Sequence, residues 1–405
     1  MQKDINKIFN LQGVIIDKVE FNDEQKVILI KARSPKNYAN CQHCGQSATK
    51  VHQYHFRKIK HGQLNYSQVI IHLRVRRIKC KKCGKIFTEK IKGIDRKKTS
   101  LNFRLQAMDW LQRNSFNYIG QKFNISPSTL IRYLVAMFDN WTIDWDKITI
   151  TKLGIDEHSF KGRNLIITIA DLSNHKLLAI LKADTQIELE NFLKNIPVSA
   201  QKRLKEVCID LCSSYREAVK KCLPGIKITA DRFHVEGLGK RALDEIRQII
   251  QVEEGKRKIH LKQLLLTNHE NLSLKELDKL DKVFERYKAF PALKEAWIIK
   301  EKIRQIYWAK NKQEALKRFQ QAIMLLETAH DSYFLKTLLK TLKEWKNEIL
   351  NYFDNKTTNG FTEGCHTKIK MLKRVSFGFR NINNYIAKMT LAFLPLLWII
   401  NYHTL

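Results

Sequence analysis

Two short cysteine motifs, far apart in the sequence, most constrain how this chain can fold. "CQHC" at residues 41–44 and "CKKC" at residues 80–83 are each followed by glycine, and 35 residues separate them. A C-x-x-C-G turn lets two thiolates approach one cation, so two such turns can complete a tetrahedral site for one structural zinc ion. The predicted ligands are Cys41, Cys44, Cys80 and Cys83.

The segment between the two motifs fits this interpretation. "QVIIHLRVRRIKC" alternates apolar with polar residues, as a strand does, and the intervening chain is expected to form a hairpin that returns to the second motif. A redox pair and buried free cysteines are the alternatives, but both explain the duplicated turn poorly. His43, inside the first turn, is not an expected ligand.

The charge of the chain indicates a polyanionic partner. The 73 lysines and arginines exceed the 40 acidic residues by 33, and residues 1–100 hold 23 basic against 7 acidic side chains. Such an excess favours nucleic acid, with double-stranded DNA as the expected partner. No basic leader with an apolar core opens the chain, and the apolar run from Met389 is too short to cross a bilayer. We expect a cytoplasmic, nucleoid-associated protein without membrane contact, in which this run forms a packed helix kinked near Pro395.

Residues 101–139 predict three short helices that resemble a helix-turn-helix. Ser126 is a good N-cap and Pro127 suits the first helical position, so the third helix has a sharp start, as a recognition helix does. Three side chains near that start are expected to face a DNA groove. They are Ser128, Thr129 and Arg132. A helical hairpin that only packs is the alternative.

From Lys152 onward the pattern changes to strands and helices in alternation. Three strands, a helix, a strand, a helix and a fifth strand follow one another up to "IKITADRFH". Asp184 is a possible cap of the first of these helices. This order predicts a ribonuclease-H-like core, in which Asp156 of the first strand and Asp210 of the fourth are neighbours.

Carboxylates repel the phosphates that a basic chain attracts, unless a divalent cation lies between them. Magnesium prefers oxygen ligands and is commonly held by one or two carboxylates together with substrate phosphate. Asp156 and Asp210 could therefore hold two magnesium or manganese ions for phosphoryl transfer. Glu363, at the start of the basic stretch "EGCHTKIKMLKR", could supply a third carboxylate.

The stretch from Glu363 predicts an amphipathic helix. Thr367, Lys370 and Arg374 fall on the face of Glu363, with His366 beside them, and apolar residues fall opposite. The acid is favoured at the helix N-terminus, and the cations behind it could hold DNA. A glutamate that merely caps a solvated helix explains the spacing equally well.

A helical insertion is expected between the last two acids. Asp210 and Glu363 are separated by 153 residues, far more than one strand and one connection need. Residues 236–350 are poor in glycine and proline, and their apolar residues recur at helical spacing.

These motifs together resemble a known family. "LGIDE", "VCIDLCSSYREAV", "ADRFHV" and "NGFTEGCHTKIKMLKRVSFGFRN", in this order behind a double zinc knuckle and a helix-turn-helix, resemble the bacterial insertion-sequence transposases of the ISL-three family. The resemblance implies a DDE transposase with Asp156, Asp210 and Glu363 as its metal-binding triad. Many members have asparagine where this chain has His366, which weakens the inference about that residue alone.

Three acidic or histidine side chains near the triad have lesser predicted roles. Asp231 and His234 resemble the D-x-x-H element of several DDE families, and we expect them to support the metal ligands; a structural pair or contact with a flipped base are the alternatives. Glu157 should point away from Asp156 because side chains alternate along a strand.

The sequence as a whole predicts a multidomain α/β protein with five segments. They are a zinc-binding module that contacts DNA (1–98), a helix-turn-helix (99–147), the first part of the core (148–235), a helical insertion (236–350) and the final part of the core (351–405). We expect a transposase that binds terminal inverted repeats as a homodimer and performs metal-dependent cleavage and strand transfer. A transcriptional regulator with an inactive core and a junction or repair nuclease are the alternatives.

Overall fold

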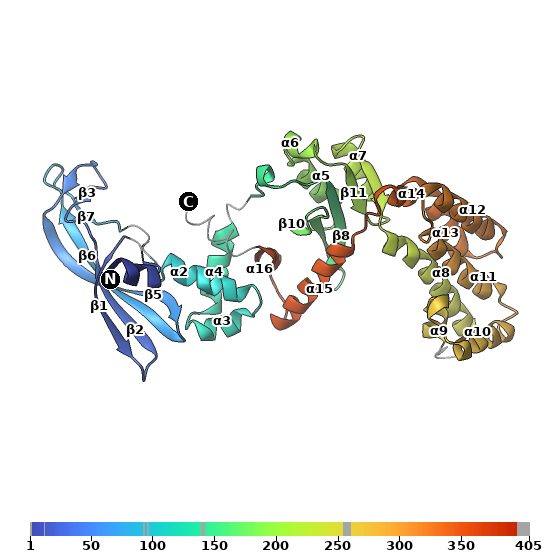
Figure 1. Cartoon of the computed structure of the whole chain (residues 1–405), viewed down its shortest axis with the longest axis horizontal. Helices are drawn as coiled ribbons and strands as arrows, with labels where there is room; N and C mark the ends of the chain where they lie inside the picture. The colour runs from blue at the N-terminus through green and yellow to red at the C-terminus, as the bar shows by residue number, and fades with distance from the viewer. Residues whose placement is uncertain are drawn as a thin grey trace. The chain divides into compact units, whose positions relative to one another are not determined.

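The computed structural model describes residues 2–11, 13–91, 94, 97–138, 142–253 and 261–394 (Figure 1). The chain divides into two compact units. The first contains residues 1–141 and 369–405, and the second contains residues 142–368. Pro395, where a kink was expected, lies outside the described residues.

A five-stranded sheet forms the body of the first unit. Its strands are β1 (Ile15–Asn22), β2 (Val27–Arg33), β5 (Val51–Leu64), β6 (Ser67–Lys79) and β7 (Ile86–Thr88). The order is β1-β2-β6-β5, with β7 beside β6, and only the β2–β6 pair is parallel. The long β5–β6 pair is the hairpin predicted between the cysteine motifs. One face of the sheet packs its apolar side chains, among them Ile30, Ile59 and Ile71, with Phe9 and Leu11, which follow helix α1 (Gln2–Ile8).

Three helices follow within the same unit, as the sequence predicts. They are α2 (Leu101–Leu111), α3 (Phe116–Lys122) and α4 (Pro127–Phe138). Ser100 and Ser115 cap α2 and α3 by accepting backbone N–H groups two or three positions into the helix. The last described helix, α16 (Ile382–Phe393), packs Leu391 against this group of helices. The sequence had instead assigned residues 351–405 to the final part of the core.

A mixed sheet forms the body of the second unit. Its strands are β8 (Lys152–Lys161), β9 (Asn164–Asp171), β10 (Lys176–Ile180), β11 (Glu206–Ile209) and β12 (Lys227–Ala230). The order is β10-β9-β8-β11-β12. β9 runs antiparallel to both β8 and β10, and β11 runs parallel to both β8 and β12. All five strands were predicted in this sequence order.

Helices connect the strands of this sheet. They are α5 (Gln186–Lys194), α6 (Val198–Gln201) and α7 (Ser213–Cys222). The cap of α5 is Thr185, whose hydroxyl accepts the backbone N–H of Glu188, and not Asp184 as expected from the sequence. Thr185 is one position closer to the first helical residue, which is where a capping oxygen reaches the free N–H groups.

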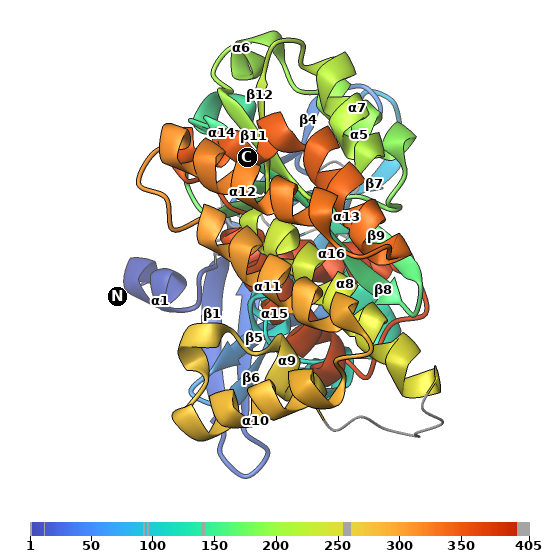
Figure 2. The same cartoon turned by 90° about the vertical axis from the view of Figure 1, so that its right-hand side faces the viewer.

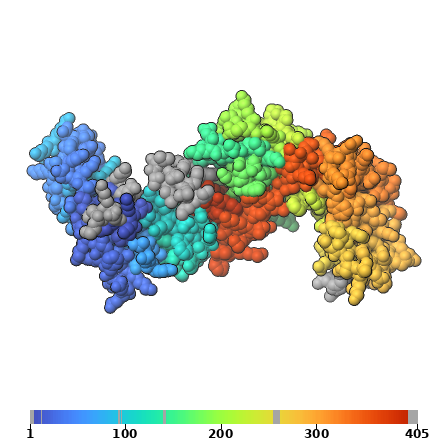
Figure 3. All heavy atoms as spheres, viewed as in Figure 1, coloured from blue at the N-terminus to red at the C-terminus, as the bar shows by residue number. Residues whose placement is uncertain are grey.

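The described residues after β12 form helices and no strand, as predicted for the insertion. They are α8 (Arg232–Glu253), α9 (Lys262–Leu266), α10 (Leu274–Arg286), α11 (Pro291–Ile306), α12 (Lys312–Thr328), α13 (Tyr333–Glu344), α14 (Lys346–Asn355) and α15 (Gly360–Val375). Helices α11, α12 and α13 pack in succession around α8 (Figure 2). In the space-filling view the helices from α9 to α14 form the yellow and orange mass of this unit (Figure 3). No helix in the described ranges is both long and apolar enough to cross a membrane.

Candidate active site

Strand pairing brings Asp156 and Asp210 together. Ile155 of β8 lies opposite Ile209 of β11 in the parallel register, and each acid follows directly after one of these isoleucines. Both carboxylates are buried. One oxygen of each, together with a ring nitrogen of His234, lies within 4.8 Å of the other two atoms. The sheet therefore holds the two predicted acids side by side, where they can share a cation.

The electrostatics of this pair are unfavourable without a cation. Burial, and then the neighbouring charge of Asp156, raise the pKa of Asp210 to about 10. Oδ1 of Asp210 lies 3.4 Å from Nε2 of His234, yet it is buried and accepts no hydrogen bond from the described residues. A buried carboxylate oxygen without a donor fits the ligand set of a divalent metal, which would supply the missing positive charge.

Asp231 and His234 lie at the junction of β12 and α8. The sequence suggested that "DRFH" ends the fifth strand, but α8 begins at Arg232, so His234 belongs to the first turn of a helix. Asp231 accepts the backbone N–H of Phe233 at 3.1 Å and thereby fixes that turn. Burial raises the pKa of Asp231.

Glu363 lies in the first turn of α15, as predicted. One oxygen of Glu363, one of Asp231 and a nitrogen of His234 lie within 4.8 Å of each other. This group and the group of Asp156 and Asp210 share His234, but neither contains both Asp210 and Glu363. The five side chains therefore form one continuous set of possible ligands, carried by β8, by the positions directly after β11 and β12, and by the first turns of α8 and α15.

Asn359 positions the helix that carries Glu363. It is fully buried, and its side-chain amide donates to the backbone oxygen of Ile155 in β8 at 2.9 Å. Its backbone N–H donates to Asp231 Oδ1 at 2.8 Å, and its backbone oxygen accepts the N–H of Glu363 at 2.9 Å. One asparagine thus links β8, Asp231 and the first turn of α15. No sequence pattern indicates this role, although Asn359 stands at the head of "NGFTEG".

His366 does not face solvent, in contrast to its predicted role in DNA contact. Its side chain is buried, with Nδ1 3.5 Å from Asp156 Oδ2 and Nε2 3.0 Å from the hydroxyl of Thr168. Nδ1 of His158 also lies 2.8 Å from that hydroxyl. The helical pattern predicted His366 at the edge of the exposed face of the helix. In the structure its contact with Thr168 of β9 makes this position part of the buried face. In this structure the ring of His366 therefore lies next to Asp156.

The other predicted residues of α15 divide as the helical pattern requires. Thr367, Lys370 and Arg374 are exposed, whereas Ile369 and Leu372 are buried. Glu157, next to Asp156, accepts a hydrogen bond from the hydroxyl of Tyr215 at 3.2 Å and belongs to neither group of possible metal ligands.

The four cysteines of the first unit also come together. Sγ of Cys41 lies 3.6 Å from that of Cys83, and Cys44 lies 3.6 Å from Cys80. All four sulfur atoms lie within 4.8 Å of one another, which fits a four-thiolate zinc site. Their backbones are arranged alike, because Gly45 and Gly84 each donate to the first cysteine of their motif and each has a positive φ of 74° or 71°.

Helix α4 presents two of its three predicted residues to solvent. Ser128 and Arg132 are exposed, and Thr129 is half-buried. The guanidinium of Arg132 donates to the hydroxyl of Thr129 at 2.8 Å, and Ser126 lies 2.9 Å from that hydroxyl. These contacts fix the side chains on the first turn of the helix.

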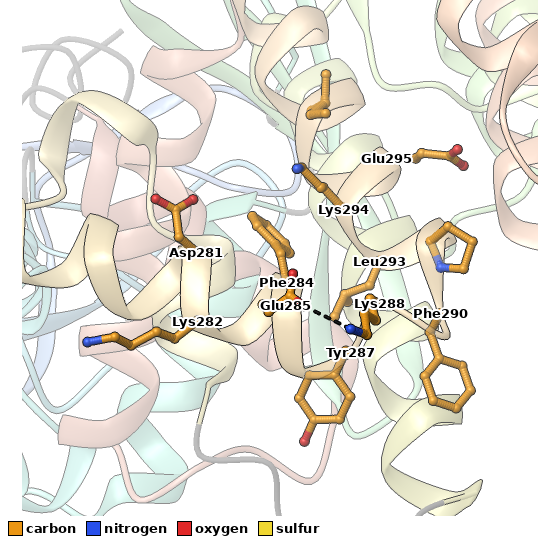
Figure 4. Close-up of a pocket in the computed structure, with 12 residues that line it drawn as sticks. Asp281, Lys282, Phe284, Glu285, Tyr287, Lys288, Phe290, Leu293, Lys294 and Glu295 are labelled. Atoms are coloured by element: carbon orange, nitrogen blue, oxygen red, sulfur yellow. Dashed lines mark hydrogen bonds and ion pairs between the residues drawn. The ribbon is translucent and has the colours of Figure 1, made fainter.

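A hollow in the helical region holds none of these residues. It has a volume of about 650 Å³ and lies between α10 and α11 (Figure 4). Its rim carries both signs of charge, and Lys288 forms an ion pair with Glu285 at 3.0 Å. The chemistry that the acids of the sheet can perform therefore does not depend on this hollow.

Comparisons with known proteins match both the cysteine motifs and the region that carries the acids. A family model described as "Transposase", of the ISL-three group, matches residues 153–389, and one described as a zinc finger of transposases IS204, IS1001, IS1096 and IS1165 matches residues 38–83. The transposase of insertion sequence element IS1001 from Bordetella parapertussis is 23% identical over 401 residues, which cover 94% of this chain and 96% of the relative. A transposase of element IS1557 from Mycobacterium tuberculosis is 24% identical over 60% of each chain.

Proposed function

The chain belongs to the ISL-three family of insertion-sequence transposases, and from this premise we propose that it binds the inverted repeats of its element and cuts and joins DNA strands at Asp156, Asp210 and Glu363. The observation that carries the proposal is a pair of overlapping groups of possible metal ligands in one unit. Asp156 and Asp210 form one group with His234, and Glu363 and Asp231 form the other with the same histidine. Buried carboxylates that lie close to one another are costly unless a cation compensates their charge.

The strand order supports a ribonuclease-H-like core. Counted in chain order, the five strands lie as 3-2-1-4-5, with the first three antiparallel and the last two parallel to the first. The sequence predicted the succession of these strands and helices along the chain, and the neighbouring first and fourth strands, for a core of this kind. The predicted acids lie on its first and fourth strands, and the helical region separates them from Glu363.

The residues that would hold divalent metal are Asp156, Asp210 and Glu363, with His234 close enough to be a direct ligand. Asp231 is better placed to support them, because its two oxygens already bind the backbone of α8 and of Asn359. When bound, two magnesium or manganese ions would supply the positive charge that makes an attacking oxygen reactive and stabilises the leaving one. The imidazole of His234 makes manganese an acceptable ion as well as magnesium.

The side chains of this chain then have distinct tasks in cleavage and joining. The carboxylates fix where phosphate and attacking oxygen can lie, Asn359 holds Glu363 in place, and His366 orients Asp156. The exposed cations Lys370 and Arg374 on α15 would bind phosphates of the DNA strand. The same acids would serve both steps, first with water and then with the liberated 3′ hydroxyl as the attacking group.

The first unit would recognise the DNA ends. We assign α2, α3 and α4 to a helix-turn-helix whose recognition helix is α4, with Ser128, Thr129 and Arg132 directed at base edges or phosphates. The zinc-binding motif of the same unit would contact DNA as well. Because both ends of an element must be joined together, the active form is a homodimer on two DNA ends.

An assay for cleavage and joining tests this proposal. The protein is incubated with a labelled inverted-repeat duplex, a target plasmid and magnesium or manganese. Glu363→Gln should abolish both products, whereas Glu217→Gln, an exposed glutamate of α7 in the same unit, should leave them unchanged. Equal activity of the two variants would reject the site. Cleavage without joining would favour a junction or repair nuclease, and specific binding without either product would favour a transcriptional regulator.

A further inference from the structure

The outward face of the β5–β6 hairpin carries aromatic and basic side chains that the proposed function does not yet use. Tyr54, Phe56 and Lys58 alternate along β5 and are all exposed, with Tyr54 52% and Phe56 72% accessible. Phe56 lies opposite Arg74 of β6, and Lys58 lies opposite His72. The two long strands can be followed in Figure 1.

The opposite face of the same hairpin shows that this exposure is not a general property of the sheet. Ile59 and Ile71 face each other there, and both are completely buried in the core of the first unit. Because side chains alternate along a strand, the intervening residues must point away from that core. Large aromatic rings on a solvent-exposed face contribute little to folding, so their position calls for a binding partner.

Charge limits what that partner can be. The guanidinium of Arg74 lies 5.4 Å from the centre of the Tyr54 ring, and neither Arg74 nor Lys58 forms an ion pair with a described residue. The nearby acids of the sheet are already engaged: Glu20 with Lys31 at 2.8 Å, and Glu89 with Arg76 at 2.7 Å. The face therefore has positive charge next to exposed aromatic rings. A ligand that carries both negative charge and aromatic groups would fit it.

We propose that this face, formed by Tyr54, Phe56, Lys58, His72 and Arg74, binds single-stranded DNA by stacking unpaired bases on Tyr54 and Phe56 and by pairing phosphates with Lys58 and Arg74. Rings two residues apart on a strand are about 6.5–7 Å apart, so each ring can receive its own base. Stacking of this kind tolerates any base sequence. In a paired duplex the flat faces of the bases are covered, so duplex DNA cannot use the rings in this way.

The inference rests on the proposed function only in taking DNA as the substrate, because strand cleavage and transfer expose unpaired nucleotides. It needs neither the acids nor divalent metal. Binding can therefore be measured in a buffer without magnesium, manganese or EDTA. The absence of EDTA keeps zinc bound, and the absence of the other two ions prevents strand cleavage.

The test compares two variants by fluorescence anisotropy with a labelled 12-nucleotide oligo-dT and with a labelled inverted-repeat duplex. The double variant Tyr54→Leu/Phe56→Leu keeps apolar side chains but removes both rings. The control is Phe21→Leu in β1, since Phe21 is 67% exposed but pairs with buried Ile28 and so belongs to the other face. The double variant should bind oligo-dT at least about 10-fold more weakly, since stacking contributes about 1–3 kcal/mol per base. It should bind the duplex as wild type does, and the control should match wild type on both.

Three results would overturn the inference: no binding of oligo-dT by the wild type, unchanged binding by the double variant, or an equal loss on oligo-dT and duplex. The last would assign the face to duplex DNA. A second measurement needs no variant. Ultraviolet crosslinking of a bromouracil oligonucleotide to wild-type protein should mark residues 51–64, and crosslinks confined to other segments would also reject it. If the wild-type protein bound oligo-dT as expected but neither cut nor joined DNA in the cleavage assay, only the proposed function would be rejected.

Discussion

Asn359 donates its backbone N–H to Asp231 at 2.8 Å, and this bond joins the start of the Glu363 helix to the acid between β12 and α8. The same residue holds the backbone of β8 beside Asp156 through Ile155. A single buried amide thus sets the separation of acids that come from three distant parts of the chain. The geometry of the site should depend on it more than on any charged residue outside the site.

Replacing Asn359 with alanine should lower activity more than stability. The change removes the side-chain hydrogen bond to β8 and leaves a buried carbonyl without its donor, which costs about 1–3 kcal/mol. Displacing a carboxylate by about 1 Å can lower the reaction rate about 100-fold. Strand cleavage and melting temperature measure the two effects. Asn195→Ala, which removes an exposed side-chain bond at the end of α5, is the control and should keep full activity. Full cleavage by Asn359→Ala would contradict the positioning role.

Gly154 in β8 should not tolerate a side chain, because Asn359 approaches it closely. A Cβ atom there would lie 2.8 Å from Oδ1 of Asn359 and 2.8 Å from Cδ2 of Leu172. We expect Gly154→Ala to lower the free energy of unfolding by about 1–3 kcal/mol through overpacking. Gly237→Ala in α8, where a Cβ meets nothing within 4 Å, should raise it by up to about 1 kcal/mol. Denaturant unfolding of both variants measures whether the free energy of unfolding falls in the first and rises in the second. Equal changes in the two variants would be inconsistent with this packing.

The strands and most helices could be predicted from the sequence because their signals are local. Alternation defines β6, and short apolar runs between turn residues define β8, β9 and β11. The neighbouring positions of Asp156 and Asp210 followed from the strand order alone. The grouping of the four cysteines could be predicted in the same way. Two C-x-x-C turns, each followed by glycine, are typical of a site in which four thiolates bind one zinc ion.

The remaining features depend on contacts between distant segments, which a sequence pattern does not contain. Asn359 looks like a loop residue until its partners in β8 and Asp231 are known. His366 lies at the border of two helix faces, and only its contact with Thr168 of β9 decides that it is buried. Similarly, α16 follows α15 in sequence, but its buried residues Ala387 and Leu391 belong to the core of α2 and α4.

Loss of one cysteine of the four-sulfur group should unfold the zinc-binding part of the first unit. Cys80 is buried and lies 3.6 Å from Cys44, so Cys80→Ser should reduce the zinc content well below one ion per chain. Proteolysis near residues 38–88 should become faster at the same time. Cys212→Ser, whose sulfur contacts only Ser214 at 3.1 Å among the bonds described, should retain zinc and resist protease as wild type does. Stoichiometric zinc in the Cys80 variant would argue against the four-thiolate site.

Asp210 should make the metal-free protein less stable as the pH rises. Its pKa is about 10 in the folded chain and about 4 in the unfolded one, so folding takes up a proton between these values. The contribution of Asp210 to stability is therefore fully present below pH 4 and is lost as the pH rises toward 10. Asp210→Asn cannot ionise, so the variant should melt at a higher temperature than wild type at pH 8, with a smaller difference at pH 5. Each kcal/mol corresponds to about 2–4 °C.

Divalent metal should reverse this order, because the cation stabilises ionised Asp210 and has little affinity for an amide. Adding manganese at pH 8 should raise the melting temperature of wild type and leave that of Asp210→Asn nearly unchanged. Asp184→Asn, an exposed aspartate of the same unit, should behave as wild type in both conditions. Differential scanning fluorimetry at the two pH values, with and without manganese, gives all four comparisons. A variant stabilised by manganese as strongly as wild type would show that the ion binds elsewhere, and a stability difference independent of pH would show that Asp210 is already ionised in the folded chain.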